Sequence, residues 1–508
     1  MVYIPGFLVN KVYERGSLRN TDEGFEFSFL NNMTPVRISG MRDISLEVDG
    51  KPYPLDKLTV SLGSRRIGFF GGEFSEKLPF DKNTRLVIRV AGEPLSPGRH
   101  AMKISFITNE YGGATLKVSD LIGEGEAPSF WRRLQDRLRA GSKEEGAGPV
   151  SVEGELGGVP LDPDFSRLEA ALRREEPDRV PLFEAEIAIP IQEWFLGREI
   201  ASARDELEFY IRAGYDFVPV LPPFPTPRLM RTASDQDGTL SAQDRERAWL
   251  TESEGLIQTV KDVENFPWPR AEEVDFSSFD EMAELLPAKM KILGMLSPAA
   301  IFGNASQAMG LQNFAYALYD DLKVVEALFE IIGSTYMKIA RRLVRQPKLG
   351  AVFMSDDLAH SHGLLVSPVV YRRYVFPWYK KIGEVLADAG LPFIFHSDGR
   401  LWEVLDDLAD CGMSGIHPLE PKAMDIVEVK RRYGDRFCLF GNIDLDYTLT
   451  RGSVAEVEAQ VKQKISQLAP GGGYGLAASN SIPDYVNPEN YRAMVMASKK
   501  YGKYPIQV

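Results

Sequence analysis

The strongest chemical signal in this sequence is at His396, which ends the apolar run LPFIF and enters the phrase SDGR. Asp398 follows two residues later, and Gly399 permits a tight turn there. An imidazole beside a carboxylate can act as a general acid or base, or the pair can bind a divalent metal ion. We therefore predict that His396 and Asp398 are catalytic.

Other polar side chains end or follow apolar runs in the same way. We also predict that Glu184 is catalytic. Two roles are possible for a group formed by His396, Asp398, Glu184 and Glu420. These residues either supply an acid or hold zinc or another divalent metal with one position open, and their spacing does not decide between these roles. The residues that we assign to substrate binding are Glu186, Asp357, His417, Asn442 and Asn480.

Some polar residues in these places also have a structural interpretation. Acids after a strand often cap a helix or form a turn, which we expect of Asp356, Asp444 and Asp484. His417 precedes Pro418 in a phrase typical of a turn. Its ring suits packing in the core as well as lining a pocket.

These residues need a scaffold that brings the ends of several strands together. After Asp178, buried apolar runs alternate with amphipathic helices, which predicts a parallel sheet. Eight such units suit a closed (β/α)8 barrel, whose active site lies at the carboxyl ends of the strands. The long insertion at 223–276 is predicted to be a lid or binding element. The predicted strands are 180–186, 216–222, 291–296, 351–356, 392–397, 414–418, 437–442 and 473–478.

The first part of the chain has a different pattern. Short runs of β-branched and aromatic residues, separated by Gly, Pro, Asn and Asp, predict an all-β sandwich domain over residues 1–122. Residues 123–172 are rich in Gly and Glu and predict a linker, with a short amphipathic helix in SFWRRLQDRLRA. The predicted fold class is therefore α/β, a (β/α)8 TIM barrel over residues 173–508 preceded by the sandwich.

Composition and charge argue against several classes of function. The 508 residues include 59 basic and 72 acidic side chains, a net charge of −13, which opposes binding to nucleic acid or to an anionic membrane. No apolar run approaches the roughly 20 residues of a membrane-spanning helix, and the N-terminus lacks a signal-peptide pattern, so we expect a cytoplasmic protein. Because Cys411 and Cys438 are the only cysteines, a metal must rely on His, Asp and Glu. The sequence leaves open whether the chain forms a homo-oligomer.

Two phrases in the first part carry a family resemblance. GMRDISLEVDGKPYP at 40–54 and LSPGRHAMKISF at 95–106 resemble the small β-sandwich subunit of the C-glycoside deglycosidases. The resemblance covers roughly residues 1–122 and implies a fold and an association with a barrel. It transfers no active-site residue.

The second part resembles the uroporphyrinogen decarboxylase superfamily, which includes methyltransferases that act with corrinoid proteins. The resemblance begins near 177 and implies the (β/α)8 barrel. The phrases that carry it are PDRVPLFE at 177–184, MSDDLAHSHGLLVSP at 354–368, FIFHSDGR at 393–400, IHPLEPKAMDIVEVKRRYG at 416–434, FGNID at 440–444 and SNSIPDYVNPENY at 479–491.

Two departures narrow the activity that this resemblance implies. Where uroporphyrinogen decarboxylase has an arginine-rich RQAGRY phrase, this chain reads EAEIAIP at 184–190, which would repel a substrate with many carboxylates. For the thiol-methylating branch of this superfamily, the resemblance implies a zinc site formed by one His and two Cys. Here the two Cys places hold Asp398 and Asn480, which puts methylation of coenzyme M or homocysteine in doubt.

The resemblance then implies a methyltransferase that moves a methyl group from a small O-, N- or S-methyl donor to the cobalt of a corrinoid. His396, Asp398 and Glu184 would polarise the leaving atom, while Asn442 and Asn480 would orient it. No DxHxxG phrase occurs to hold the corrinoid, so we expect it on a separate partner protein. Two alternatives are kept, a decarboxylase or metal-assisted lyase acting on a small or glycosidic substrate and a non-catalytic binding homologue.

Overall fold

The chain forms two compact units in the computed structural model, residues 1–129 with 240–247 and residues 130–239 with 248–508. Each unit is described by itself. The residues that the structure describes are 2–3, 17–21, 24–30, 36–38, 41–49, 51–54, 57–62, 65–68, 73–74, 78–80, 85–95, 98–108, 112–122, 148–156, 158–223, 230–232, 250–296 and 300–506.

The described strands of the first unit pair antiparallel, apart from the parallel pair of β1 with β13. One sheet contains β1 (Val2–Tyr3), β13 (Gly112–Ile122), β12 (Gly98–Thr108), β5 (Met41–Val48) and β6 (Lys51–Tyr53), with β9 (Glu73–Phe74) beside β5. A second contains β2 (Arg19–Thr21), β3 (Gly24–Leu30), β11 (Arg85–Ala91), β7 (Leu58–Leu62) and β8 (Arg65–Gly68). A third pairs β4 (Val36–Ile38) with β10 (Leu78–Phe80).

Alternating apolar residues explain why these strands form sheets with a buried face. Phe25, Phe27 and Phe29 alternate along β3 and are buried, as the twofold period of a strand requires. The ring of Phe25 also meets that of Tyr53 on the other large sheet, with 5.3 Å between the ring centres. The apolar faces of the two large sheets therefore meet at this point.

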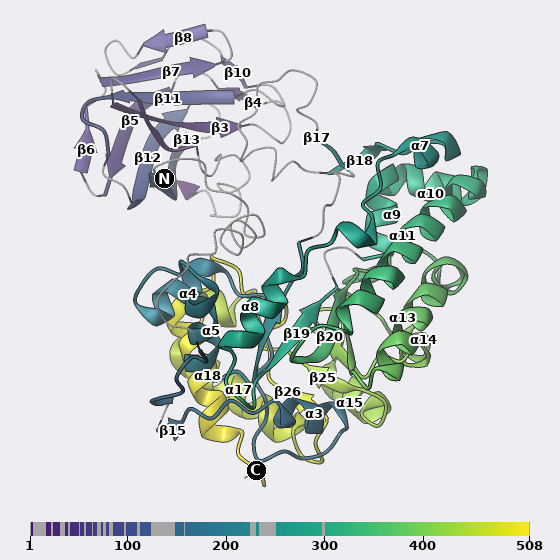
Figure 1. The fold of residues 1–508 in the computed structure, drawn as a ribbon. Coiled ribbons are helices and arrows are strands. Elements are labelled where there is room, and N and C mark those ends of the chain that lie inside the picture. The colour runs from purple at the N-terminus through teal and green to yellow at the C-terminus, as the bar shows by residue number, and fades with distance from the viewer. Residues whose placement is uncertain are drawn as a thin grey trace. The chain divides into compact units, whose positions relative to one another are not determined.

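The second unit is built on one parallel sheet (Figure 1). A further segment, 180–187, pairs in parallel with the chain after β26 through Leu182 with Leu476 and Ile187 with Ile482. The eight predicted strands overlap this segment and the seven strands of the sheet. In spatial order these are β16 (Phe217–Val220), β19 (Lys291–Met295), β20 (Leu349–Ser355), β23 (Phe393–His396), β24 (Gly415–His417), β25 (Cys438–Phe440) and β26 (Tyr474–Gly475).

Four phenylalanine rings inside this sheet show that it is curled. Phe183 lies beside β26 in the strand order, yet its ring meets Phe217 of β16 at the other edge, with 5.3 Å between ring centres. The same ring stacks on Phe440 at 4.1 Å and lies 5.9 Å from Phe353. The sheet therefore wraps around an aromatic core like a half-barrel.

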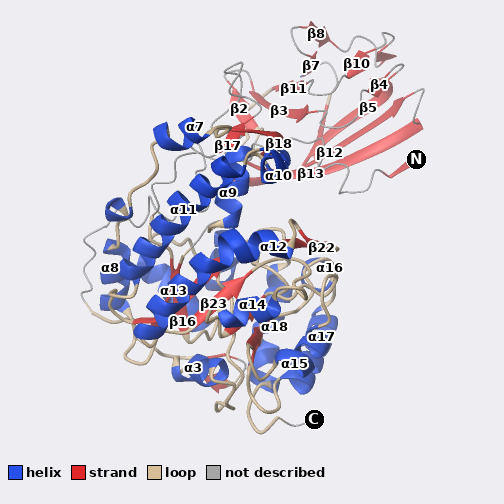
Figure 2. Ribbon diagram, turned by 90° about the vertical axis from the view of Figure 1, so that its right-hand side faces the viewer, coloured by secondary structure: helices blue, strands red, loops and turns tan. Residues whose placement is uncertain are grey.

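Helices cover the outside of the curled sheet (Figure 2). Their apolar residues recur at helical spacing, as in α11, where Val325, Phe329 and Ile332 are buried. The helices are α3 (Ser166–Leu172), α4 (Ile189–Leu196), α5 (Ala203–Arg212), α7 (Val260–Asn265), α8 (Ser277–Leu285), α9 (Phe302–Met309), α10 (Leu311–Asp320), α11 (Leu322–Leu343), α12 (Pro368–Val370), α13 (Phe376–Asp388), α14 (Leu405–Asp410), α15 (Ile426–Tyr433), α16 (Thr448–Arg451), α17 (Val454–Leu468) and α18 (Pro488–Tyr501).

Short elements complete the second unit. A 3-10 turn and a π-helical turn, η2 (Ala271–Glu273) and η3 (Tyr371–Val375), lie between the longer helices. The paired short strands are β14 (Glu155–Leu156) with β15 (Val159–Pro160), β17 (Met230–Thr232) with β18 (Leu250–Gly255), and β21 (Ala359–His360) with β22 (Gly363–Leu364). Among the described residues, no helix is both long and apolar enough to cross a membrane.

The end of the predicted linker is packed into the second unit. Leu156, Phe165 and Leu168 are buried in its core, and a Cβ added at Gly350 would lie only 2.5 Å from the Phe165 ring. The predicted amphipathic helix in 129–140 lies outside the described residues. Residues 148–172 therefore differ from the prediction, because a few large apolar side chains anchor a Gly- and Glu-rich segment.

The predicted lid is described only in part, because residues 224–229 and 233–249 lie outside the described ranges. Beyond β18 the insertion follows the outer helices. The N–H of Ile257 donates to the carbonyl of Ala308 on α9, and Arg342 of α11 donates to the carbonyl of Ala271. The part of the insertion from 255 to 276 thus packs against helices of the second unit.

Candidate active site

The ends of β23 and β24 bring two histidines together. His396 and His417 are the last residues of these strands and are register partners in the parallel pair. Their Nδ1 atoms are 2.7 Å apart, and both rings are buried, at 9% and 1% exposure. His417 also lies against the aromatic core, 5.5 Å from the Phe183 ring centre. The two histidines therefore form a buried, hydrogen-bonded pair above the phenylalanine rings.

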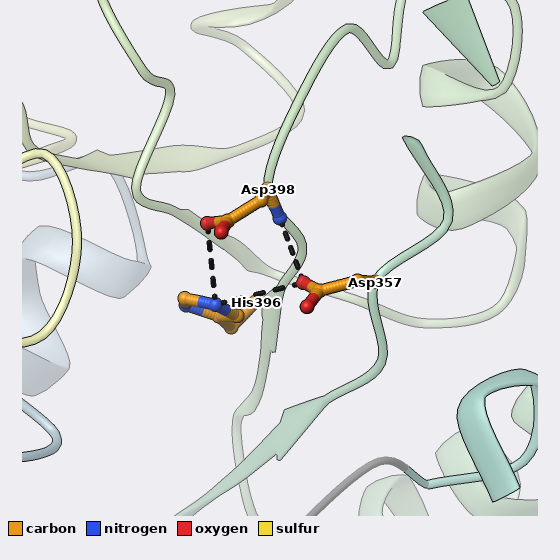
Figure 3. A group of neighbouring side chains, drawn as sticks. All are labelled: Asp357, His396 and Asp398. Atoms are coloured by element: carbon orange, nitrogen blue, oxygen red, sulfur yellow. Dashed lines mark hydrogen bonds and ion pairs between the residues drawn. The ribbon is translucent and has the colours of Figure 1, made fainter. Parts of the chain in front are cut away.

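Two acids meet the other side of the His396 ring (Figure 3). Its Nε2 lies 3.6 Å from Oδ1 of Asp398 and 3.8 Å from Oδ1 of Asp357. The loop is held in this arrangement because the N–H of Asp398 donates to Oδ1 of Asp357, at 2.9 Å. Asp357 is 58% exposed at its side chain and Asp398 33%, so the group opens to solvent on the side of the acids.

Asp398 is fixed by a third residue, Asn480. The amide Nδ2 of Asn480 donates to both carboxylate oxygens of Asp398, each at 2.9 Å. Burial raises the pKa of Asp398 to about 6, the charges of Asp357 and Glu420 add to the rise, and His396 and Asn480 oppose it. Glu420 itself accepts from the N–H of Gly399 through Oε2, at 2.8 Å. The carboxylate of Asp398 is thus oriented by Asn480 and crowded by like charge.

One ligand atom from each of Asp357, His396 and Asp398 lies within 4.8 Å of the other two. Atoms bound to one ion at about 2.1 Å are about 3–4 Å apart, so the separations from Nε2 suit a shared divalent ion. One nitrogen and two carboxylate oxygens are a donor set that zinc and other divalent ions accept. The group therefore fits such an ion, with sites left for a substrate atom.

Glu184 and Glu420, which were predicted as metal ligands, lie outside this group of three. The Glu184 carboxyl is fully buried, and its Oε1 accepts from the N–H of Ala478 at 2.6 Å. Burial raises the pKa of Glu184 well above its usual range. Its Oε2 has no partner among the described residues. The structure therefore places Glu184 in a seam between two strands, where burial favours the neutral form of its carboxyl.

The pairing of this seam is uneven. Four residues lie between Leu182 and Ile187, whereas five lie between their partners Leu476 and Ile482. The extra residue forms a bulge, a feature that often lies at barrel rims and redirects a side chain. Glu184 supplies the acceptor for Ala478 within this interval. Asn480 lies in the same interval, and its side chain reaches Asp398.

Glu186 lies near the same seam, where its backbone carbonyl accepts from Ile482. Its side chain is half-buried, and burial raises its pKa to about 7. The amide of Asn442 is buried and donates to the carbonyl of Leu419 at 2.7 Å. Asn442 Oδ1 and His417 Nε2 have no partners among the described residues. Asn442 Oδ1 can therefore accept a further hydrogen bond, and His417 Nε2 can accept or donate one, depending on its tautomer.

The prediction of a helix cap or a turn is correct for all three acids, and two of them cap helices. Asp356 is buried and accepts from the N–H groups of Ile301, Phe302 and Gly303 at the start of α9, each at 2.7 Å, and from the hydroxyl of Tyr379 at 2.6 Å. Burial raises its pKa to about 6, and these four donors oppose the rise. The helix that Asp356 caps follows the neighbouring strand β19 in the chain.

The other capping positions lie farther along the chain. Asp444 accepts from Tyr447 and Thr448 at the start of α16. Asp484 lies in a turn, whereas Asn487 caps α18. These residues therefore have structural roles near the rim.

Sequence reasoning missed two relationships in the site. It assigned Asp357 to substrate, although Asp357 lies nearly as close to the His396 ring as Asp398 does. It also gave Asn480 a direct substrate role, whereas its amide is used by Asp398. The adjacent acids Asp356 and Asp357 carried a usable signal, because neighbouring residues after a strand point in opposite directions.

Comparisons with known proteins place part of the chain in a family. The family described as "Uroporphyrinogen decarboxylase (URO-D)" matches residues 254–501, which confirms the predicted resemblance of the C-terminal part. Residues 8–123 match the family described as "Hydroxymethylglutaryl-CoA reductase, N-terminal domain". The predicted resemblance of the N-terminal part to C-glycoside deglycosidases stays a prediction.

Curated relatives and solved structures are similar to part of this chain. The methylcobamide:CoM methyltransferase MtaA of Methanosarcina barkeri is 31% identical over 41% of this chain and 57% of its own length. The uroporphyrinogen decarboxylase of Chlorobaculum tepidum is 25% identical over 42% of this chain and 62% of its own length. The chain thus spans about three fifths of these relatives. A methyltransferase structure from Methanosarcina mazei is 20% identical, with a TM-score of 0.48, over 66% of this chain and 98% of that one.

Proposed function

Since its C-terminal part contains a domain of the uroporphyrinogen decarboxylase family, we propose that this chain is a methyltransferase. It moves a methyl group from a small O-, N- or S-methyl donor to the cobalt of a corrinoid that a separate protein carries. Relatives named as methylcobamide:CoM methyltransferases support the class of reaction. The donor class rests on the side chains of the site.

The observation that carries the proposal is the group formed by Asp357, His396 and Asp398. Asp398 and Asn480 stand where the resemblance places the two thiolates of the thiol-methylating branch. The group is therefore rich in oxygen ligands and lacks sulfur, which suits an oxygen or nitrogen leaving atom better than an incoming thiol. A divalent ion held by these three residues would supply Lewis-acid stabilisation of the negative charge.

Methyl transfer to a reduced corrinoid leaves charge on the donor. A reduced corrinoid would accept the methyl group without the electron pair of its bond, so that pair would stay on the heteroatom. A departing alkoxide or phenolate, or the anion left by a methylamine, would therefore have to be stabilised or protonated. The leaving atom binds beside Nε2 of His396, between Asp357 and Asp398.

The surrounding residues keep this arrangement rigid. Asn480 holds both oxygens of Asp398, and the peptide N–H of Asp398 holds Asp357. The rings of Phe183 and Phe353 close the interior beneath the histidines and exclude water from that side. The substrate thus reaches the group from the side of the exposed acids, where the corrinoid protein also has to dock.

We extend the proposal to the architecture. The contact between Phe183 and Phe217 supports a closed (β/α)8 barrel over residues 173–508. The contact between Phe25 and Tyr53 supports a β-sandwich over residues 1–122.

The test uses the full chain and reduced cobalamin as a methyl acceptor. A panel of methoxy-aromatics, methylamines and methyl thioethers is offered with Zn²⁺, and formation of methylcobalamin is followed by absorbance. The wild-type chain transfers methyl from at least one donor. H396A removes one of the three proposed ligands of the ion. Because losing even a hydrogen-bond partner of a metal ligand typically costs about 10–100-fold in affinity or activity, H396A should lose about a hundredfold or more in rate.

The matched control is H362A, because His362 is exposed on the turn between β21 and β22 and should leave the rate unchanged. Equal rates in H396A and the wild type would refute the assignment. Carbon dioxide release from a carboxylated substrate without methyl transfer would favour the decarboxylase alternative. Binding without turnover across the panel would favour a non-catalytic homologue.

A further inference from the structure

The bond between the two histidine rings requires one proton donor and one acceptor. Nδ1 of His396 and Nδ1 of His417 are 2.7 Å apart, and a neutral imidazole carries its proton on one of its two nitrogens. The proton in this bond therefore belongs either to His396 or to His417. Nε2 of His396 faces Asp357 and Asp398. The position of the proton therefore decides whether this nitrogen has a free lone pair.

The surroundings of His417 are apolar. Its ring is 1% exposed and lies against Phe183 and Phe353. The acids nearest the pair, Asp357 and Asp398, face Nε2 of His396. His417 thus acts through one shared hydrogen bond.

If His417 donates in that bond, the proton of His396 is on Nε2 and points toward the two acids. If His396 donates, Nε2 has a free lone pair there, and a metal-binding histidine needs this arrangement. We infer that His417 is a positioning residue whose Nδ1 accepts from Nδ1–H of His396 and so presents the His396 Nε2 lone pair to the space between Asp357 and Asp398. This inference rests on the metal site of the proposed function.

Two substitutions separate this role from simple packing. H417F keeps a buried aromatic ring but cannot accept a hydrogen bond. H417N loses more packing volume yet places an amide oxygen near the position of Nδ1, where it can accept from His396. A packing role predicts that H417N is the worse variant, whereas the positioning role predicts the reverse.

The experiment measures Zn²⁺ affinity by competition with a chelator, together with histidine ¹⁵N spectra of the Zn²⁺-loaded chain. The chain has five histidines, so single substitutions assign every ring. We expect His396 to carry its proton on Nδ1 in the wild type. H417F should weaken Zn²⁺ binding by about 10- to 100-fold, which is typical of losing such a partner, and H417N should stay within about threefold of the wild type.

H362N is the matched control and should bind Zn²⁺ like the wild type. Thermal melting followed by tryptophan fluorescence shows whether each variant is folded. If H417F does not fold, the Zn²⁺ affinity of H417N relative to the wild type tests the inference. The inference is overturned by a proton on Nε2 of His396, by wild-type Zn²⁺ affinity in H417F, by equal losses in both variants, or by a wild-type chain that binds no Zn²⁺. Zn²⁺ results as expected without methyl transfer would overturn the proposed reaction alone.

Discussion

Glu186 should make the second unit less stable as the pH rises from 5 to 8. Its pKa is raised by burial to about 7, from an ordinary 4.5. Between these values the unfolded chain releases the proton of Glu186 while the folded chain keeps it. The folded state therefore binds more protons, and its stability falls as the pH passes through this window.

The size of the effect follows from the two pKa values. The difference between 4.5 and about 7 corresponds to ~3 kcal/mol at ~1.4 kcal/mol for each tenfold change in proton affinity. The side chain is only half-buried, so solvent reduces this to about 1–2 kcal/mol. E186Q cannot ionise and should be as stable as the wild type at pH 5. At pH 8 it should be more stable by about 1–2 kcal/mol.

Urea unfolding followed by tryptophan fluorescence measures this difference. All six tryptophans lie in the sequence ranges of the second unit, so the signal reports on that unit. E199Q is the matched control, because Glu199 is exposed. The reasoning is refuted if the difference between E186Q and the wild type is the same at pH 5 and pH 8, or if E199Q shows the same change.

Two further predictions concern residues around the histidine pair. D356A leaves three backbone N–H groups and the Tyr379 hydroxyl without their buried acceptor. Each lost partner costs ~1–3 kcal/mol, and relaxation reduces the sum, so the free energy of unfolding in urea should fall by about 3–5 kcal/mol. A fall of less than about 1 kcal/mol would contradict the capping role. The double variant D398C/N480C places two thiols at positions whose side chains now touch. With Co²⁺ it should give a sulfur-to-metal charge-transfer band that D398C alone shows weakly. A band no stronger than that of D398C alone would show that residue 480 does not face the ion.

The sequence could predict the strands and His396 because local patterns specify them. Buried apolar runs marked each strand of the second unit, and a histidine ending such a run stood out. The direction of Glu184 was not predictable in this way, because its carboxyl replaces a backbone acceptor in a bulge that only the pairing of distant strands reveals. Leu156 and Phe165 were read as linker residues because the glycines and acids around them masked two apolar anchors.

The bond from His396 to His417 had a visible basis, since both residues end neighbouring strands. Its atoms could not be chosen from sequence, because either ring nitrogen could have faced the partner. The grouping of Asp357 with Asp398 also needed coordinates, since it depends on the peptide N–H that joins their loops.

The bulge between 476 and 482 has a consequence for how this site could evolve. Removing a single residue from that interval would even the pairing with the segment 182–187 and turn the side chain at 480 to the opposite face. Asp398 would then lose its amide support without any change to His396, Asp357 or Asp398 themselves. A gap of one position in this stretch of a homologue would therefore signal a different chemistry, even where every acid and histidine is retained.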